Sequence, residues 1–553
     1  MKKLLILVLL LQLFWCCRSK KKADLLFFNG KIYTVDKNFS IAESFAVNGG
    51  RVVGIGSSKN LLNEFDSKEK IDLQGKPVYP GFIDAHCHFF QYATDLEKAN
   101  LFGTKSFEEV LNKVAEFSVA SHAVSGNGNY NWILGRGWDQ NDWDVKEFPS
   151  KEKLDSMFPY TPVYLVRVDG HAVLCNGEAL RQSHVSASTK INGGEVGIKN
   201  GILTGILVDN AVDLVRNNIP PFTKEIIADC LLRAQANCFA LGLTTVDDAG
   251  LGKDSIEVMM AMQKSGQLKM RIYAMASMTE ENKKYFFDHG PIKTDRMNVR
   301  SFKMYADGAL GSRGACLLQP YSDQLNHTGF LLHDENYFEE AASEMGSHGF
   351  QLCTHAIGDS ANRLILELYT KYLKGKNDKR WRIEHAQVVN KNDFKLFGEN
   401  DIIPSVQPTH ATSDMYWAEK RLGNERVKTA YAYNDLLKNS NGTIAFGTDF
   451  PVENINPMYT FYAAVARKDL NGFPETGFQP ENKISRQDAL RAMTRWAAYS
   501  NFEENEKGSL ENGMFADFII LDKDIMQADE KEIPNVKVMA TYVNGEKVFE
   551  GIK

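Results

Sequence analysis

The sequence has little excess of either charge: 64 lysines and arginines stand against 70 aspartates and glutamates, a net charge of −6 in 553 residues. A protein that binds nucleic acid usually presents a strongly basic surface, so this balance argues against nucleic acid as a partner. Low-complexity tracts and repeats of fixed period are also absent from the sequence, which argues against linkers and solenoids. The composition is that of a globular protein, and the length predicts a large core with added modules.

Cysteine is sparse, and long apolar runs are missing. Of eight cysteines, two lie near the start, and the others form no CxxC pair and no short knot, so no disulfide framework is predicted. The longest apolar run lies in "MKKLLILVLLLQLFWCC". At roughly a dozen residues it is too short for a comfortable membrane span and is typical of a secretory leader.

Residues 1–22 are therefore predicted to be a signal peptide or a lipid-anchor segment. The protein is expected to be exported, either to a bacterial periplasm or to a membrane to which its N-terminus anchors it. Cys16 and Cys17 stand where a lipoprotein carries its acylated cysteine, whereas Phe14 and Trp15 stand where small residues are usual. Lipid anchoring, simple cleavage and an uncleaved anchor remain alternatives.

The middle of the chain alternates apolar, β-rich runs with helical patterns. The runs are residues 78–86, 241–249, 270–277, 299–307, 350–359, 380–389, 402–410 and 442–450. Eight strands alternating with helices predict an α/β fold, a closed (β/α)8 TIM barrel. The first two runs are too far apart for one crossover, so an inserted subdomain is expected after the first barrel strand.

Both ends of the chain share a different sequence pattern, in which short β-rich runs are separated by Asn-Gly and Gly-Gly turns. They predict one small β-sandwich module built from both termini. The expected boundaries are residues 23–79 and 496–553 for this module, and 80–495 for the barrel with its insertion at about 90–240.

The first barrel run ends in "DAHCHFF". Alternate side chains of a strand share a face, so His86 and His88 point together while Cys87 points away. Two imidazoles on one face are a natural pair of metal ligands, but a metal that performs chemistry needs further ligands.

Further polar residues end the later runs, and in a parallel barrel these ends converge on the face that carries active sites. The set is Lys303, His355, His385 and Asp449. The histidines and the aspartate suit zinc or a similar divalent ion. An ammonium has no lone pair, but a desolvated Lys303 beside cations loses its proton and can take up carbon dioxide as a carbamate that bridges two metals. Taken singly, these residues also have structural interpretations, such as a core histidine or a turn-capping Asp449.

This pattern resembles the amidohydrolase superfamily. "ADLLFFNGKIYTVD" and "EKGSLENGMFADFIILDKD" resemble its opening and closing segments, and "GRGWDQNDW", "VDGHAVLCN" and "KMYADGALGSR" resemble the subgroup that contains N-substituted formamide deformylases. The resemblance covers nearly everything from residue 23 onward, and it implies a hydrolase acting on non-peptide carbon–nitrogen bonds.

The resemblance also implies roles for these residues and two metals per chain. The implied ligands are His86, His88 and Asp449 for the more buried metal, and His355 and His385 for the second, with carboxylated Lys303 as the bridge. A metal-bound hydroxide is the implied nucleophile, and Asp449 the implied general base and acid.

Residues of the insertion are expected to meet a small-molecule substrate. Trp138 is predicted to stack on an apolar group or to pack within the subdomain, and Asp139 lies beside it. His171 is a candidate catalytic donor to the carbonyl oxygen. Arg313 either pairs with Asp307 or holds a substrate carboxylate.

Several alternatives remain open. A deaminase of the same barrel uses one metal and has no need of Lys303, and a binuclear site can also attack lactones and phosphoesters. Isomerases share the superfamily, and an exported binding protein without activity is a further alternative. A homodimer is compatible with the sequence, which does not name the substrate.

Overall fold

In the computed structural model, the described residues are 20–124, 131–168, 170, 172–191 and 194–551, so the predicted leader lies almost wholly outside them. The chain divides into two compact units, residues 1–89 with 235–553 and residues 90–234. The division falls within helix α8 (Lys224–Ala240) and at the start of α3 (Phe89–Asp95). Within the described residues, no helix combines the length and apolar character that a membrane crossing requires.

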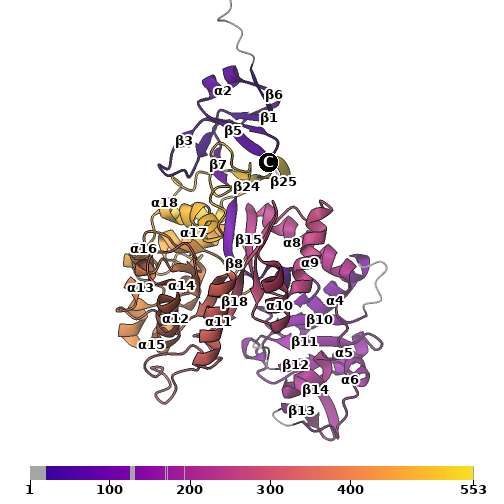
Figure 1. Cartoon of the computed structure of the whole chain (residues 1–553). Coiled ribbons are helices and arrows are strands. Elements are labelled where there is room, and N and C mark those ends of the chain that lie inside the picture. The colour runs from indigo at the N-terminus through magenta and orange to yellow at the C-terminus, as the bar shows by residue number, and fades with distance from the viewer. Residues whose placement is uncertain (1–19, 125–130, 169, 171, 192–193, 552–553) are drawn as a thin grey trace, which may run out of the picture. The chain divides into compact units, whose positions relative to one another are not determined.

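The first unit contains the predicted barrel, whose strands are drawn in Figure 1. The strands are β8 (Phe82–Cys87), β15 (Leu243–Leu251), β16 (Arg271–Ser277), β18 (Met297–Tyr305), β19 (Gln351–Ala356), β20 (Arg382–His385), β21 (Ile403–Val406) and β22 (Ala445–Phe446). Each pairs in parallel with the next, and the short β17 (Ile292–Lys293) pairs antiparallel with β18. The prediction of an α/β barrel is confirmed.

The barrel closes through the residues that follow β22. The Asp449 N–H donates to the His86 carbonyl (2.7 Å), and the His88 N–H donates to the Phe450 carbonyl (2.8 Å). Gly447 permits this approach, because a Cβ at its position would lie 2.4 Å from the His86 nitrogen. The seam between the last and first strands therefore runs directly beside the His-x-His pair.

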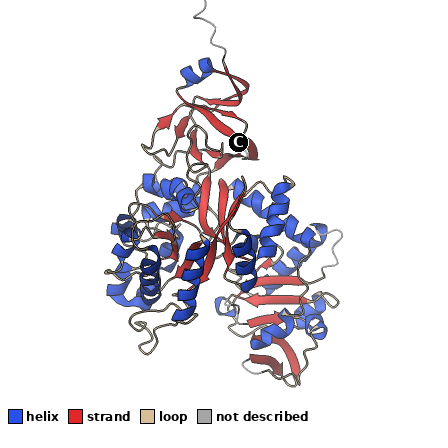
Figure 2. Cartoon of the chain, in the orientation of Figure 1, coloured by secondary structure: helices blue, strands red, loops and turns tan. Residues whose placement is uncertain are grey.

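Helices flank the barrel strands (Figure 2). They are α9 (Lys253–Lys264), α10 (Glu280–His289), α11 (Glu335–His348), α12 (Asp359–Leu373), α13 (Phe394–Glu399), α14 (Pro408–Asp414), α15 (Ala418–Arg426), α16 (Tyr433–Asn439), α17 (Pro457–Ala466), α18 (Arg486–Ala492) and α19 (Arg495–Ser500). In α11 the Asp334 carboxylate caps the first turn and left-handed Gly349 ends the helix, while Phe338 and Met345 lie buried on one face. Sequence periodicity thus sets which face each helix turns inward.

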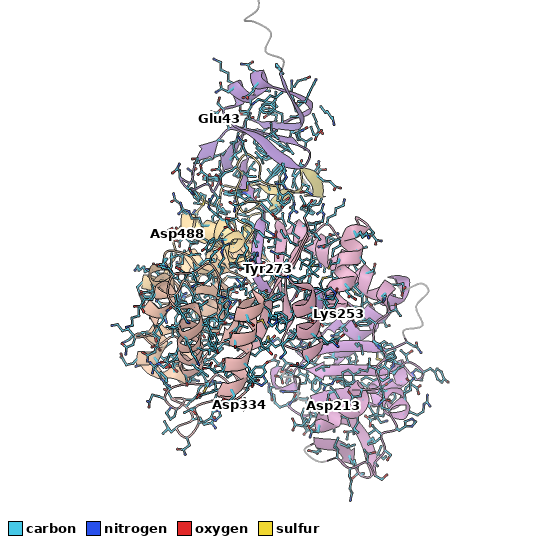
Figure 3. The ribbon with its side chains drawn as sticks, in the orientation of Figure 1. Glu43, Asp213, Lys253, Tyr273, Asp334 and Asp488 are labelled. Carbon is cyan, nitrogen blue, oxygen red and sulfur yellow. The ribbon has the colours of Figure 1, made fainter. Side chains whose placement is uncertain are left out.

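The barrel interior is filled by side chains rather than open. Tyr273, labelled in Figure 3, is fully buried on β16, and its hydroxyl donates to Gln351 Oε1 (2.8 Å) on β19. At one end of the barrel, α19 packs Ala497 and Ala498 against Ile83 of β8. Helix α19 therefore belongs to the barrel, and the C-terminal β structure begins later, at Phe518.

Two sheets at the chain ends share one core in the same unit. The first, in the order β5-β4-β1-β6, comprises β1 (Lys21–Phe28), β4 (Ser44–Asn48), β5 (Arg51–Gly56) and β6 (Phe65–Asp72), with α2 (Ser58–Glu64) between the last two. The second, in the order β25-β24-β23-β7-β2-β3, comprises β2 (Lys31–Tyr33), β3 (Ile41–Ala42), β7 (Pro77–Pro80), β23 (Phe518–Leu521), β24 (Val538–Val543) and β25 (Glu546–Glu550). The ring of Phe27, from the first sheet, meets Phe518 and Tyr542 of the second edge-on, so residues of both termini build this core.

The second unit has one mixed sheet with the strand order β13-β14-β12-β11-β10-β9. Its elements are β9 (Ala99–Asn100), α4 (Phe107–Val124), β10 (Ile133–Trp138), α5 (Glu152–Met157), β11 (Val163–Arg167), β12 (Ala172–Cys175), α6 (Gly177–Gln182), β13 (Gly194–Lys199), β14 (Ile202–Asp209) and α7 (Asp213–Arg216). Leu165 and Leu174, from neighbouring strands of the sheet, lie in its hydrophobic core. This unit follows the first barrel strand directly in the chain.

Candidate metal centre

The carboxyl ends of the barrel strands bring the predicted donors together. Asp449 Oδ1 lies 3.2 Å from His88 Nε2 and 3.6 Å from His86 Nε2. One ligand atom from each of these three residues can be chosen so that all lie within 4.8 Å of one another. The two imidazoles come from the end of β8 and the carboxylate from the turn after β22, so the barrel seam assembles this group.

Lys303 lies beside the same histidine. Its Nζ is 3.1 Å from His86 Nε2, and the lysine is only 1% exposed on β18. Burial lowers the pKa of Lys303 below its usual value. Burial of this kind favours the neutral amine over the ammonium.

His355 and His385 lie next to each other, with ring centroids 4.5 Å apart. The Nδ1 of His385 is 2.8 Å from Gln407 Oε1, which leaves its Nε2 for other partners. His355 Nε2 is 3.6 Å from Asp307 Oδ1. Among the described residues, His385 belongs to a second cluster of metal-binding type, but that cluster contains His410 rather than His355.

His410 is the donor that sequence reasoning missed. It lies in the first turn of α14, directly after β21, with Nε2 3.7 Å from Asp449 Oδ2 and its ring parallel to that of His385 at 5.9 Å. The sequence does carry a signal for it. The seventh apolar run ends in His410, just as the fifth and sixth runs contain His355 and His385. Asp449 therefore stands between two sets of histidines, one facing each carboxylate oxygen.

These donors fit a divalent cation. Among the described residues, His355 Nε2 and His410 Nε2 are buried and make no hydrogen bond. Buried polar atoms are almost always paired in folded proteins, so these two unpaired nitrogens, on rings that both adjoin His385, indicate a missing partner. Imidazole nitrogens with a carboxylate oxygen form a donor set typical of zinc and related metals.

The protonation states agree with metal binding. Burial lowers the pKa of His86 to about 4 and that of His355 to about 3, and the neighbouring Lys303 charge adds to both shifts. Burial alone would raise the pKa of Asp449, but the surrounding histidines, His88 first, hold it well below its usual value. At neutral pH His86 and His355 are thus neutral and the Asp449 carboxylate is ionised, the forms that bind metal.

The buried Asp84 carboxylate connects the segment that carries His86 to the segment that carries Asp449. Asp84 Oδ2 accepts the Thr448 hydroxyl (2.7 Å), and its Oδ1 accepts the N–H groups of Thr448 (3.0 Å) and His86 (3.2 Å). Asp449 itself has a φ of 63° and His385 a φ of 72°, in the sparsely populated left-handed region. Such conformations persist where the surrounding structure imposes them, as these hydrogen bonds do for Asp449.

The predicted substrate residues lie in other surroundings. Trp138 is 1% exposed in the core of the second unit, and its indole N–H donates to the Leu165 carbonyl (2.8 Å). We therefore assign Trp138 to packing of this unit rather than to substrate contact. Asp139 forms an ion pair of 2.5 Å with Arg167 within the same unit.

The remaining two candidates are Arg313 and His171. Arg313 pairs with Asp323 at 2.9 Å, rather than with Asp307. Asp307 instead accepts the N–H groups of Ile357 (3.0 Å) and Gly358 (2.8 Å), which orders the turn after His355. His171 lies outside the described residues, and its role as a donor stays a prediction.

The barrel and its donor set define a metal-dependent hydrolase. The chain belongs to the Amidohydrolase family, whose sequence profile matches residues 69–549. This confirms the resemblance on which the functional expectation rested.

Several known proteins are similar over almost the whole chain. Protein LONG AFTER FAR-RED 3 of Arabidopsis thaliana is 33% identical over 549 residues, covering 95% of this chain and 92% of that protein. N-substituted formamide deformylase of Arthrobacter pascens is 25% identical, covering 95% and 98%. An uncharacterized metal-dependent hydrolase from Pyrococcus horikoshii has a similar structure, with a TM-score of 0.77, 27% identity, and coverage of 92% and 99%.

Proposed function

We propose that the protein hydrolyses a non-peptide C–N bond, of amide, N-acyl or N-formyl type, in a small molecule. The observation that carries the proposal is the position of Asp449 between two sets of histidines, with Oδ1 3.2 Å from His88 Nε2 and Oδ2 3.7 Å from His410 Nε2. The similarity to N-substituted formamide deformylase over 95% of the chain supports the type of bond.

Two divalent metals, zinc or similar, are part of this proposal. His86, His88 and Asp449 would hold the first, and His385 would hold the second together with His410 or His355. A divalent metal bound there brings the pKa of a water towards neutrality and polarises a carbonyl group. Asp449, ionised at neutral pH, accepts a proton from the attacking water and delivers it to the departing nitrogen.

Lys303 completes the proposed site as a carbamate. Its buried amine, in the neutral form, attacks the carbon of carbon dioxide; a C–N bond forms and one proton leaves to water, which gives a carboxylate on Nζ. That product has two oxygens and can bridge two cations, whereas an ammonium has only donors. The distance of 3.1 Å from Nζ to His86 Nε2 supports the placement of this group beside the first donor set.

A mononuclear deaminase is the second candidate. His86, His88 and Asp449 alone already supply three donors for a single cation, which is enough for a catalytic site with an open position. Under this alternative, Lys303 remains an amine and His385 and His410 contact the substrate instead.

Metal stoichiometry separates the candidates. The protein without residues 1–22 is expressed with zinc and bicarbonate, and its metal content is measured by elemental analysis. We expect about two metals per chain for the carbamate-bridged site, and about one for the deaminase. A protein that binds none, even after reconstitution, would contradict both.

A substrate panel then tests the bond. We expect turnover of N-formyl and simple amide compounds, and none of matched amino-heterocycles that a deaminase would hydrolyse. Faster turnover of esters or lactones than of matched amides would overturn the assignment of a C–N bond.

Export is a separate proposal, based on the charged start and short apolar run of residues 1–22. Fractionation of cells that express the full chain tests it, because an exported protein is found in the periplasm or the membrane fraction. Metabolic labelling with a fatty acid, compared with a Cys16→Ser, Cys17→Ser double variant, distinguishes lipid anchoring from simple cleavage.

A further inference from the structure

Glu384 is a buried carboxylate that the proposed chemistry does not use. It precedes His385 on β20, is fully buried, and places Oε2 2.5 Å from Nδ1 of His86. The imidazole thus has the carboxylate on one side and, on its Nε2 side, Lys303 Nζ at 3.1 Å and Asp449 Oδ1 at 3.6 Å.

This arrangement fixes the tautomer of His86. An ionised carboxylate only accepts hydrogen bonds, so Nδ1 must carry the proton that faces Glu384. In the neutral ring the lone pair then lies on Nε2, the nitrogen directed at Lys303 and Asp449. The ring therefore presents the form that a metal requires, without any rearrangement.

Glu384 is held in place by a neighbouring arginine. Arg382 Nε is 2.7 Å from Glu384 Oε1, and Nη2 donates to Oε2 at 3.1 Å. The same guanidinium donates to Asp247 Oδ2 (3.0 Å) on β15 and to Ser405 Oγ (2.8 Å) on β21. Arg382, Asp247 and Glu384 are all fully buried, so the carboxylate is anchored to three strands of the barrel.

We propose that Glu384 is a positioning residue that fixes the tautomer and ring orientation of His86 and thereby sets the metal affinity of the site. This inference rests on the proposed metal-dependent function. Glu384 itself does not reach the substrate, because its oxygens are directed at His86 and Arg382.

The test compares two glutamates that are both buried and both paired with cations. Glu384→Gln removes the charge next to His86 while keeping the size of the side chain. Glu503→Gln is the matched control, since Glu503 is 4% exposed and pairs with Lys293 (2.5 Å) and Lys507 (2.6 Å) rather than with a predicted ligand.

Zinc affinity is measured on the full folded proteins by competition with a chromophoric chelator. The visible absorption of the cobalt-substituted proteins reports the surroundings of the metal. We expect zinc to bind about 10- to 100-fold more weakly to Glu384→Gln, with an altered cobalt spectrum, because loss of a carboxylate that orients a ligand histidine has effects of this size. Glu503→Gln should match the wild-type protein in both measurements.

Each result has a distinct meaning. Wild-type affinity and spectrum in Glu384→Gln would overturn the inference, while a wild-type protein that binds no metal would instead overturn the proposed function. Equal losses of zinc affinity in Glu384→Gln and Glu503→Gln would mean that Glu384 only stabilises the fold, and this result would also overturn the inference. If Glu384→Gln does not fold, Glu384→Asp takes its place, because it keeps the charge but withdraws the oxygens from His86. Wild-type zinc affinity and cobalt spectrum in Glu384→Asp would then overturn the inference.

A measurement on the wild-type protein needs no variant. Nitrogen-15 spectra of histidine-labelled apoprotein should show one imidazole, assigned with a His86→Gln sample, that is protonated at Nδ1 and exchanges slowly with solvent. An unprotonated Nδ1 at His86 would overturn the inference whatever the variants show.

Discussion

Thr448→Val tests whether the Asp84 hydrogen bonds hold the metal centre together. The substitution keeps the size of the side chain but removes a hydroxyl that donates to Asp84 Oδ2 (2.7 Å) and accepts from the Phe450 N–H (3.0 Å). Thr448 is 2% exposed and Asp84 likewise, so water does not readily replace these partners. Each lost buried hydrogen bond costs roughly 1–3 kcal/mol, and the two together about 2–6 kcal/mol.

The matched control is Thr448→Ser, which keeps the hydroxyl and loses a single methyl group, at a cost of about 1 kcal/mol. Urea unfolding of the apoproteins is followed by tryptophan fluorescence, and transition midpoints are compared because a chain of two compact units need not unfold in one step. Zinc affinity is measured in parallel. We expect Thr448→Val to unfold at lower urea and to bind zinc more weakly than Thr448→Ser, because Asp84 connects His86 to the segment that carries Asp449. Equal midpoints and equal zinc affinities in the two variants would refute this reasoning.

Three further predictions concern Asp449, His410 and the buried ion pair of Asp517 with Arg271. Asp449→Asn should keep the fold, measured by circular dichroism, and lose at least about 100-fold in turnover, because the proton acceptor is gone; a variant with full activity would contradict that role. His410→Ala should lower the zinc content by about one metal per chain if the second donor set holds a cation, whereas unchanged elemental analysis would assign His410 to the substrate side. Burial alone would raise the pKa of Asp517, but the Arg271 charge and hydrogen bonds hold it below its usual 3.8. The stabilisation of the fold by ionised Asp517 is therefore fully present above pH 3.8, and it is lost as the pH falls through the lower pKa of the folded state. Asp517→Asn should therefore cost about 3–5 kcal/mol at pH 7, by thermal or urea denaturation, and the difference from wild type should shrink in acid; a constant difference between pH 7 and pH 2 would contradict the linkage.

The barrel could be predicted from the sequence because its signal is repeated. Every strand of the ring was marked by its own apolar run, and the rule that parallel strands end on one face then gathered distant residues such as His86 and Asp449. The same rule, applied to the seventh run, would have included His410. It was overlooked because this histidine begins helix α14 instead of ending a strand.

Other features depend on contacts that a single sequence does not reveal. The role of Glu384 rests on a histidine about 300 residues away, and the sequence does not indicate that pairing. A buried tryptophan and a substrate-facing one look alike in sequence, so Trp138 could not be assigned. The partner of Arg313 is Asp323 because of a loop conformation that hydrophobic patterning does not specify.

Closure of the barrel at the seam also imposes an order in time. His86 and His88 leave the ribosome more than 300 residues before Asp449, and the hydrogen bond from the Asp449 N–H to the His86 carbonyl cannot form until the last barrel strand has been made. A nascent chain therefore has separate histidines but no complete donor set, since large proteins acquire their long-range contacts late. A complete donor set thus requires that all eight barrel strands have been synthesised, and a chain truncated before residue 449 lacks the Asp449 carboxylate.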